Sequence, residues 1–258
     1  MVNMKSAPQK FRGIVISRQA YRESDLLVKI LTDRFGTKMF MFNRARRPGF
    51  KLAAAILPFT SAVYEGTIRA DGLSYIRQAA DVSACTHISA DIETDAYATY
   101  ILALIDMAYP DGEPIPQWFD FAATALRRMD AGLDAAILTN IAEVQLLGAF
   151  GVAPHWQDCV VCHRRDLPLD FSEKYGGVLC QDHWTLDGRR YHASAKAIYL
   201  LRSFAAVPLA RLGKVQVAPA TRRELRVLLD RIYDDMVGAT PRAKRFIDQM
   251  GQWQQHLQ

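Results

Sequence analysis

Two short pairs of metal-binding residue types stand out in this chain. Cys159-Val-Val-Cys162 is followed by Cys180-Gln-Asp-His183, with two residues between the ligands of each pair. Tetrahedral Zn²⁺ takes four nitrogen or sulfur ligands, and each C-x-x-C or C-x-x-H half supplies two from one tight turn. Gly176-Gly177 stand just before the second pair, where a turn needs residues without Cβ strain. The spacing predicts a structural zinc site whose ligands are Cys159, Cys162, Cys180 and His183.

Two other interpretations of the cysteines are weaker. Cys159-Val-Val-Cys162-His163 also matches the C-x-x-C-H signal for c-type haem attachment. That chemistry occurs outside the cytoplasm, whereas residues 1–10 contain no apolar signal core, and it leaves Cys180 and His183 unused. A disulfide or redox pair is disfavoured because no βαβ pattern or secretion signal accompanies the cysteines. We keep His163 and His155 as alternative fourth ligands and expect Cys85 to be a small buried hydrophobe.

The net charge of +5 hides a strong asymmetry along the chain. Residues 1–80 carry 14 Lys and Arg against 5 Asp and Glu, whereas residues 81–150 carry 2 against 11. A block this basic predicts contact with a polyanion. Its densest element is Asn43–Lys51. The arginines of this element follow a predicted strand and precede the Pro48-Gly49 turn, so they should lie on an exposed loop where they can bind phosphate oxygens. We predict DNA contacts from Arg22, Lys29, Arg34, Lys38, Arg44, Arg46, Arg47 and Lys51.

Three phenylalanines, Phe40, Phe42 and Phe50, are interleaved with this basic element. An exposed phenylalanine could stack on a base. For each of them taken singly, however, a place in the core of a barrel is the expectation.

The hydrophobic pattern changes from strand-like to helical near residue 89. Five β-rich segments separated by turn signals occupy residues 11–17, 26–31, 37–42, 61–65 and 73–77. They predict a small antiparallel barrel; an SH3-like barrel fits the count, and an OB-fold is preferred because it combines five strands with a basic surface. Helices are expected over about 89–109, from the break at 111–116 to about 129, and over about 133–148, 194–208 and 221–237, with Ser194 as a cap. The predicted class is α+β, with an OB-fold domain at 1–82 and a helical domain at 83–258 carrying a zinc-binding insertion at about 155–187.

Common catalytic motifs are absent from the sequence. It contains no G-x-x-x-x-G-K-[ST], G-x-G-x-x-G, H-E-x-x-H or G-x-S-x-G, so we expect no enzymatic activity. Asp234-Asp235 and the Asp91, Glu93, Asp95 group could hold Mg²⁺, but their places on polar helix faces favour simple solvation. No apolar run is as long as a membrane span, and a soluble, cytoplasmic protein is expected.

Several segments resemble the RecO family of bacterial recombination mediators. They are Gly13-Ile-Val15, Tyr21–Asp25, Leu31-Thr32 with Gly36, Ala45–Arg47, Leu57–Thr60, Leu146–Gly148 and Phe171-Ser172, in addition to Cys159, Cys162, Gly176-Gly177 and Cys180. The similarity covers most of the chain and is weakest after about residue 210. It implies an N-terminal OB-fold and a C-terminal helical domain, which often bears a four-cysteine zinc module. This sequence has His183 where those members have the fourth cysteine, and we expect Zn²⁺ to bind because a Cys₃His set is acceptable to it.

The resemblance also implies a function without catalysis in DNA repair and recombination. Such proteins bind single- and double-stranded DNA, anneal complementary strands and engage the acidic C-terminal tail of the single-stranded DNA-binding protein SSB. With RecR they help to load RecA onto SSB-coated DNA in the bacterial cytoplasm, in association with the nucleoid. The SSB tail should dock where a hydrophobic pocket meets basic residues, and the basic stretch 189–231 is a candidate.

Two other functions fit the same features. A zinc-containing regulator of transcription or RNA would share the basic barrel and the metal site, but it would bind particular sequences rather than anneal strands. A scaffold protein would hold a partner through the acidic residues 81–150.

Overall fold

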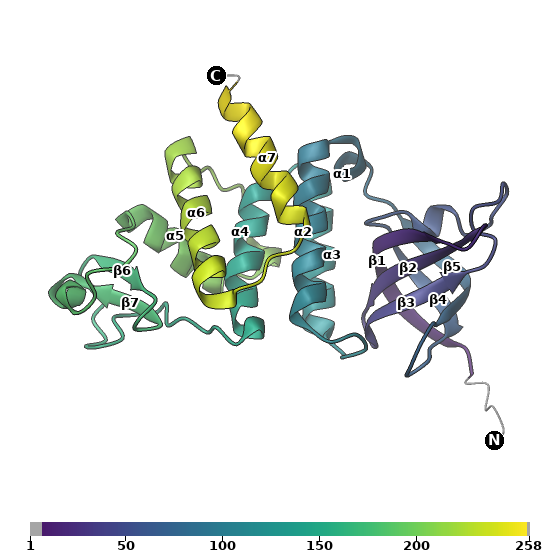
Figure 1. The fold of residues 1–258 in the computed structure, drawn as a ribbon, viewed down its shortest axis with the longest axis horizontal. Coiled ribbons are helices and arrows are strands. Elements are labelled where there is room, and N and C mark those ends of the chain that lie inside the picture. Colours follow the sequence, from purple (N-terminus) through teal and green to yellow (C-terminus); the bar gives the residue numbers. More distant parts are fainter. Residues whose placement is uncertain (1–6, 257–258) are drawn as a thin grey trace. The chain divides into compact units, whose positions relative to one another are not determined.

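The computed structural model describes residues 7–256, with side chains described up to residue 250. The first six residues of the N-terminal segment discussed above therefore lie outside the described range. The chain divides into two compact units, Met1–Gly132 and Leu133–Gln258. Among the described residues, the first unit contains a five-stranded sheet and three helices, and the second contains four helices and a small hairpin (Figure 1). The predicted α+β class is confirmed.

All five strands expected in the first 80 residues are present. They are β1 (Gln9–Tyr21), β2 (Asp25–Thr32), β3 (Gly36–Phe42), β4 (Ser61–Thr67) and β5 (Tyr75–Ser83). The strands pair in the order β3-β2-β1-β4-β5, and every pair is antiparallel. The two outer strands also approach each other at a single parallel bridge between Phe40 and Ser74. The sheet is thus strongly curved but not closed by a continuous ladder, which is consistent with a partly open OB-type barrel.

Alternating residues of these strands fill the inside of the curved sheet. Phe11 stacks on Phe40 with ring centroids 5.7 Å apart, and Tyr64 lies 5.9 Å from Phe11. Phe40 and Phe42 are buried, so the expectation that they belong to the core is confirmed. Phe50 is half-buried and packs edge-on against Phe42, which leaves part of its ring accessible.

Three helices complete the first unit: α1 (Thr86–Ala90), α2 (Ile92–Ala108) and α3 (Pro116–Asp130). The sequence predicts one helix from about residue 89, whereas the chain breaks at Asp91, which caps α2 by accepting a 2.9 Å hydrogen bond from the Thr94 amide. The apolar residues 92, 96, 100, 104 and 105 predict one buried face for this helix. The prediction is wrong for Ile92, which is 68 % exposed.

The acidic helices of the first unit contact its basic sheet. The Lys29 ammonium lies 2.7 Å from the Asp106 carboxylate and 3.2 Å from Asp111. The α2–α3 loop also hydrogen-bonds to the sheet through the Gly112 amide and the Thr37 carbonyl, 2.9 Å apart. Gly36 lies in the left-handed region at φ +59°, and a Cβ there would be 1.9 Å from the Glu113 carbonyl oxygen. Within this unit, therefore, part of the acidic segment neutralises part of the basic one.

The second unit is built on α4 (Ala135–Leu146), α5 (Ala195–Ala206), α6 (Pro219–Ile232) and α7 (Ala243–His256). The first three confirm predicted helices, and the Ser194 hydroxyl caps α5 as expected. The sequence did not predict α7 or the hairpin of β6 (Leu169–Ser172) and β7 (Gly177–Cys180). None of the helices among residues 7–256 is long and apolar enough to cross a membrane.

A buried ion pair joins α4 to α6. The Glu143 side chain is fully buried and accepts two hydrogen bonds from the Arg226 guanidinium, at 2.7 and 3.1 Å. Arg226 also contacts Asp230, whose carboxylate lies 2.8 Å from the Lys244 ammonium at the start of α7. These charges hold three helices of the second unit in register.

Candidate metal centre and nucleic-acid interface

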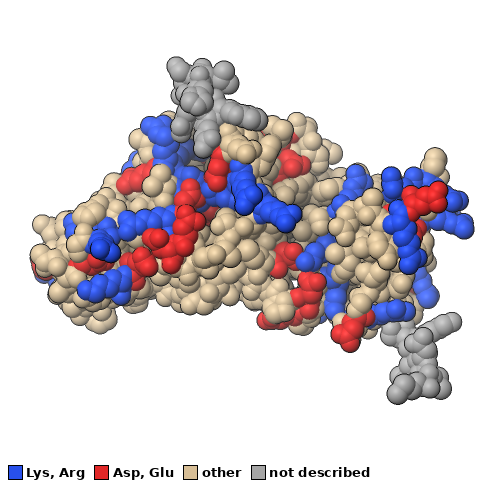
Figure 2. All heavy atoms as spheres, viewed as in Figure 1, with Lys and Arg blue, Asp and Glu red and all other residues tan. Residues whose placement is uncertain are grey.

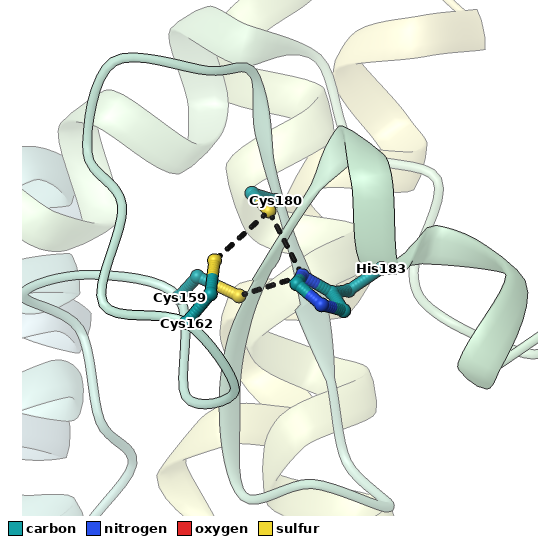
Figure 3. A group of neighbouring side chains, drawn as sticks. All are labelled: Cys159, Cys162, Cys180 and His183. Carbon is teal, nitrogen blue, oxygen red and sulfur yellow. Dashed lines mark hydrogen bonds between the residues drawn. The ribbon is translucent and has the colours of Figure 1, made fainter.

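The hairpin of β6 and β7 positions the four predicted metal ligands. Cys180 is the last residue of β7, and His183 lies in the 3₁₀ turn Gln181–Leu186 that follows. The turn carrying Cys159 and Cys162 is tied to β7 because the Val160 amide donates to the Val178 carbonyl at 3.0 Å. As predicted, Gly176 provides the tight turn before β7, at φ +60°. Figure 3 shows the three sulfur atoms and the imidazole of His183 pointing toward one another.

The distances between these ligand atoms match tetrahedral coordination. Sγ of Cys162 lies 3.6 Å from Sγ of Cys180, and Nδ1 of His183 lies 3.7 and 3.2 Å from the sulfurs of Cys159 and Cys180. Zinc bonds of about 2.3 Å to sulfur and 2.0–2.1 Å to nitrogen place two sulfurs about 3.8 Å apart and a sulfur and a nitrogen about 3.6 Å apart. A disulfide bond would need about 2.05 Å. The arrangement therefore fits one metal ion bound by all four side chains.

The surroundings of Cys159 favour its thiolate, which is the metal-binding form. Burial alone would raise the pKa of this thiol, but the backbone amides of Cys180, Cys162 and Val161 hydrogen-bond to the sulfur and lower the pKa to about 6. Burial and the neighbouring sulfurs raise the pKa of the Cys180 thiol, so in the absence of metal the cluster shares its protons unequally.

Cys85 and the two alternative histidine ligands do not join the cluster. Cys85 belongs to the other unit, where its half-buried thiol faces the Phe59 carbonyl and burial raises its pKa to about 11. His155 and His163, the alternative fourth ligands, instead contact the carboxylate of Asp158. The fourth position of the cysteine cluster is thus filled by His183.

A groove lies on helix α5, beside the segment of about residues 155–187 that carries the metal ligands and is called the cysteine module below. The Arg202 guanidinium donates to the carbonyls of Trp156 and Gln157 at 2.7 and 2.6 Å and so ties the module to the helix. The groove has a volume of about 370 Å³ and is lined by Trp156, Gln157, Arg165, Tyr199, Arg202, Ser203, Ala205 and Ala206. Tyr199 is 65 % exposed. The groove combines aromatic surface with cationic groups.

Strand register brings five of the eight predicted DNA-binding residues to one end of the sheet. The β1–β2 hairpin closes at the Tyr21–Asp25 pair, and Leu26 pairs with Phe42, so the loop after β3 lies beside the β1–β2 turn. Asp25 fixes this loop because its carboxylate accepts a 2.8 Å hydrogen bond from the Arg44 amide. The five residues at this end are Arg22, Arg44, Arg46, Arg47 and Lys51. Figure 2 shows Lys and Arg side chains gathered over the strands of this unit.

A hollow with a volume of about 530 Å³ lies at this end of the sheet and is called the cationic hollow below. Its cations are Arg44, Arg47, Lys51 and Arg77, and its aromatic rings include Phe50 and Tyr75. Arg46 is exposed beside it, and its guanidinium donates to the Glu23 carbonyl. Arg77 and Tyr75 were not among the predicted residues. That the Arg77 side chain points away from the core follows from the alternation with buried Ile76 on the same strand. Its nearness to the loop after β3, which carries Arg44, Arg46 and Arg47 and is called the arginine loop below, depends on the curvature of the sheet.

The other three predicted residues lie elsewhere on the sheet. Lys29 is engaged with Asp106 and Asp111; burial alone would lower the pKa of its ammonium group, but these carboxylates raise it overall. Arg34 lies in the β2–β3 turn, where it donates to the Lys10 carbonyl, and Lys38 donates to the Ala70 carbonyl at 3.0 Å. The eight residues therefore form one group of five and three separate positions.

Comparison with known proteins identifies the family. A family model described as Recombination protein O N terminal matches residues 4–84, and one described as Recombination protein O C terminal matches residues 89–245. The chain belongs to the recombination protein O family. Similar proteins named DNA repair protein RecO include one from Levilactobacillus brevis, 52 % identical over 96 % of this chain and 95 % of that protein. The corresponding values are 50 %, 98 % and 97 % for one from Limosilactobacillus reuteri and 50 %, 96 % and 96 % for one from Lactiplantibacillus plantarum.

The two candidate sites fall in different RecO family matches. The cationic hollow lies in the N-terminal match, and the cysteine cluster lies in the C-terminal match. The matches meet between residues 84 and 89, whereas the compact units divide after Gly132. Helices α2 and α3 thus lie within the C-terminal family match but belong to the same compact unit as the N-terminal sheet.

Proposed function

We propose that this protein is a DNA-binding recombination mediator that acts in DNA repair without catalysing a reaction. The observation that carries the proposal is the cationic hollow, whose lining includes four cations and two half-buried aromatic rings, Phe50 and Tyr75. Its location within the match to the RecO N-terminal family model supports the proposal. We further propose that the five-stranded sheet is an OB-fold, that residues 1–82 form the DNA-binding domain, and that residues 83–258 form the helical domain.

The cationic hollow has the groups needed to hold a single strand. Arg44, Arg47, Lys51 and Arg77 would neutralise phosphates and release counterions. Phe50 and the face of Tyr75 that the Arg69 guanidinium, 5.2 Å from the ring centroid, does not cover would accept bases by stacking, a contact that tolerates any sequence. Arg22 and Arg46 extend the charge along the β1–β2 turn, and duplex DNA would be bound by the same phosphate contacts. Arg34 and Lys38 remain candidates for a longer path, whereas Lys29 would first have to leave its ion pairs.

Strand annealing follows from charge neutralisation. Two complementary strands repel each other through their phosphates, and a basic surface that holds both lowers this repulsion enough for bases to pair. No nucleotide hydrolysis is needed for this step. The protein would then act with RecR to load RecA onto DNA that SSB has coated.

The acidic tail of SSB would bind in the groove on α5. Arg202 supplies positive charge there, Arg165 lines the groove while paired with Asp158, and Trp156 and Tyr199 supply apolar surface, which suits a short acidic peptide with hydrophobic residues. Tyr199→Ala should weaken binding of an SSB tail peptide. Val227→Ala removes an equally exposed hydrophobic residue from α6 and should leave binding unchanged.

The cysteine cluster would hold a structural zinc ion. Cys159, Cys162, Cys180 and His183 supply four ligands and leave no position open for a substrate, so the metal would contribute folding free energy rather than chemistry. Metal analysis of the purified protein should find zinc at these residues. Zinc below stoichiometric amounts, together with ready alkylation of Cys159 and Cys162, would contradict this part of the proposal.

A strand-annealing assay tests the function directly. Complementary oligonucleotides labelled with a donor and an acceptor dye are coated with SSB, and their pairing is followed by energy transfer. The protein should accelerate pairing for any sequence, and SSB lacking its acidic tail should reduce the effect. A regulator of transcription or RNA would instead prefer one sequence without annealing, and a scaffold would do neither; either result would refute the proposal.

A further inference from the structure

Two histidines and an aspartate form a second cluster next to the cysteine ligands. Nε2 of His155 lies 2.7 Å from Oδ1 of Asp158, and Nδ1 of His163 lies 3.1 Å from the same oxygen. The three ligand atoms all lie within 4.8 Å of one another. We infer that His155, Asp158 and His163 form a second binding site for a divalent transition metal ion, distinct from the Cys₃His cluster.

The distances within this cluster suit coordination of one ion. Metal bonds of about 2.0–2.1 Å place neighbouring nitrogen and oxygen ligands about 2.9–3.4 Å apart, depending on whether the geometry is octahedral or tetrahedral. The separations of 2.7 and 3.1 Å lie about 0.2 Å on either side of the octahedral value. Two imidazoles and one carboxylate are a ligand set that zinc and its neighbours in the periodic table accept.

Rigid backbone positions hold the three side chains. His155 is bridged to β7: its amide donates to the Gly176 carbonyl at 2.9 Å, and its carbonyl accepts from the Val178 amide at 3.1 Å. His163 follows Cys162 in the left-handed region, at φ +61°, and this conformation directs its ring back toward Asp158. The cluster is therefore built on the same turn and strand that carry the cysteine cluster.

The Asp158 carboxylate is oriented for a metal on one side only. Its side chain is 10 % exposed, and its second oxygen, Oδ2, accepts hydrogen bonds from Arg165 at 3.0 and 3.3 Å. Arg165 thus plays the part that outer partners of metal-binding carboxylates commonly play, fixing the group while Oδ1 faces the imidazoles. The exposed sides of His155 and His163, at 42 % and 73 %, leave room for water to complete the coordination.

The two clusters should differ in affinity and in spectrum. The cysteine cluster has four ligands and thiolate sulfur, so it should fill first. The second cluster has three ligands and an open side, so it should bind more weakly and exchange its metal with solution. A metal there would link the segment before the first cysteine to the turn after the second.

Cobalt titration of the full-length apo-protein distinguishes the two sites. Co²⁺ bound to thiolate gives a charge-transfer absorption, which should saturate at one equivalent, whereas total bound cobalt should reach two equivalents. His163→Asn should lower the total to one and leave the charge-transfer band unchanged. Asparagine is chosen because it tolerates the left-handed backbone.

His192→Asn is the matched control because His192 is also exposed and has a left-handed backbone, at φ +53°. It should still bind two cobalt ions. In the unaltered protein, the second equivalent of Zn²⁺ should shift the ring NMR signals of His155 and His163 but not those of His192. Binding of no metal beyond that held by thiolate, or two equivalents in His163→Asn, would overturn the inference. Loss of the charge-transfer band alone would count only against the cysteine cluster.

Discussion

Removing cations from the hollow should reduce the salt dependence of DNA binding by a predictable amount. The perturbation is the triple variant Arg44→Asn, Arg47→Gln and Lys51→Gln. Asparagine is used at position 44 because that residue has φ +55°, which asparagine tolerates and alanine does not. The Arg44 amide can therefore still donate to Asp25 and hold the loop.

The magnitude follows from the three cations that the variant removes from the lining of the hollow. Each phosphate contact with single-stranded DNA contributes about 0.7 to the slope of log affinity against log salt, so losing three contacts should flatten the slope by about 2.1. Between 50 and 200 mM salt, the unaltered protein should accordingly lose about twentyfold more affinity than the variant. At low salt the variant should bind more weakly than the unaltered protein.

Fluorescence anisotropy with a labelled single strand measures both slopes. The control is Arg127→Gln, Arg242→Gln and Arg245→Gln, which removes the same charge from exposed positions outside the hollow. Its slope should remain close to that of the unaltered protein. Equal slopes for the two triple variants would show that net charge, and not the hollow, governs binding, and would refute the placement of DNA there.

Four further expectations test other parts of the structure. Arg47→Gln should flatten the salt slope more than Arg46→Gln in the same anisotropy assay, because Arg47 lines the hollow and Arg46 lies beside it; equal effects would contradict this distinction. Arg226→Met should lower the free energy of unfolding by about 3–5 kcal/mol in denaturant titration, because it removes the two hydrogen bonds that Arg226 donates to the buried Glu143 carboxylate. The double variant Glu143→Leu, Arg226→Met should recover much of this loss, and Arg223→Met, at an exposed position on the same helix, should cost little. Asp91→Ala should cost about 1 kcal/mol through loss of the α2 cap, whereas Asp91→Asn keeps a capping side chain and should cost less. Hydrogen bonds from the Thr94 hydroxyl and amide lower the pKa of Asp91, so the stability that the ionised carboxylate contributes is complete above the unfolded pKa of about 3.9 and is lost as pH falls through the lower folded value. The difference in free energy of unfolding between the unaltered protein and Asp91→Asn should therefore shrink in acid. A difference that stays constant with pH would refute this assignment. Removal of the metal by a chelator should lower the melting temperature measured by calorimetry, and the fall should be larger at neutral than at acidic pH because protons compete for the thiolates; an unchanged melting temperature would show that metal does not hold the module.

Strand positions in the first 80 residues could be predicted because alternation and turn residues mark them locally. The cap of α5 by Ser194 could be predicted for the same reason. The hairpin of β6 and β7 escaped prediction because each strand has only four residues, all of them buried, so there is no alternation to detect. The exposure of Ile92 escaped because a helical stripe does not reveal where its first turn leaves the core.

The amino-acid sequence by itself determined the ligand types of the cysteine cluster and the basic character of the first 80 residues. Cysteine and histidine spacing within a single turn is a local property, and so is net charge. Only the tertiary structure decided which cations act together: strand pairing placed Arg77 beside the arginine loop and engaged Lys29 with the acidic helices. It likewise gathered His155 and His163 on Asp158 rather than on the cysteines. The contacts of Arg77 and Lys29 join residues far apart in the chain, so they depend on strand pairing and helix packing and not on local residue preference. His155, Asp158 and His163 are close in the chain, and their contacts depend on the bridge between His155 and Gly177 and on the left-handed backbone of His163.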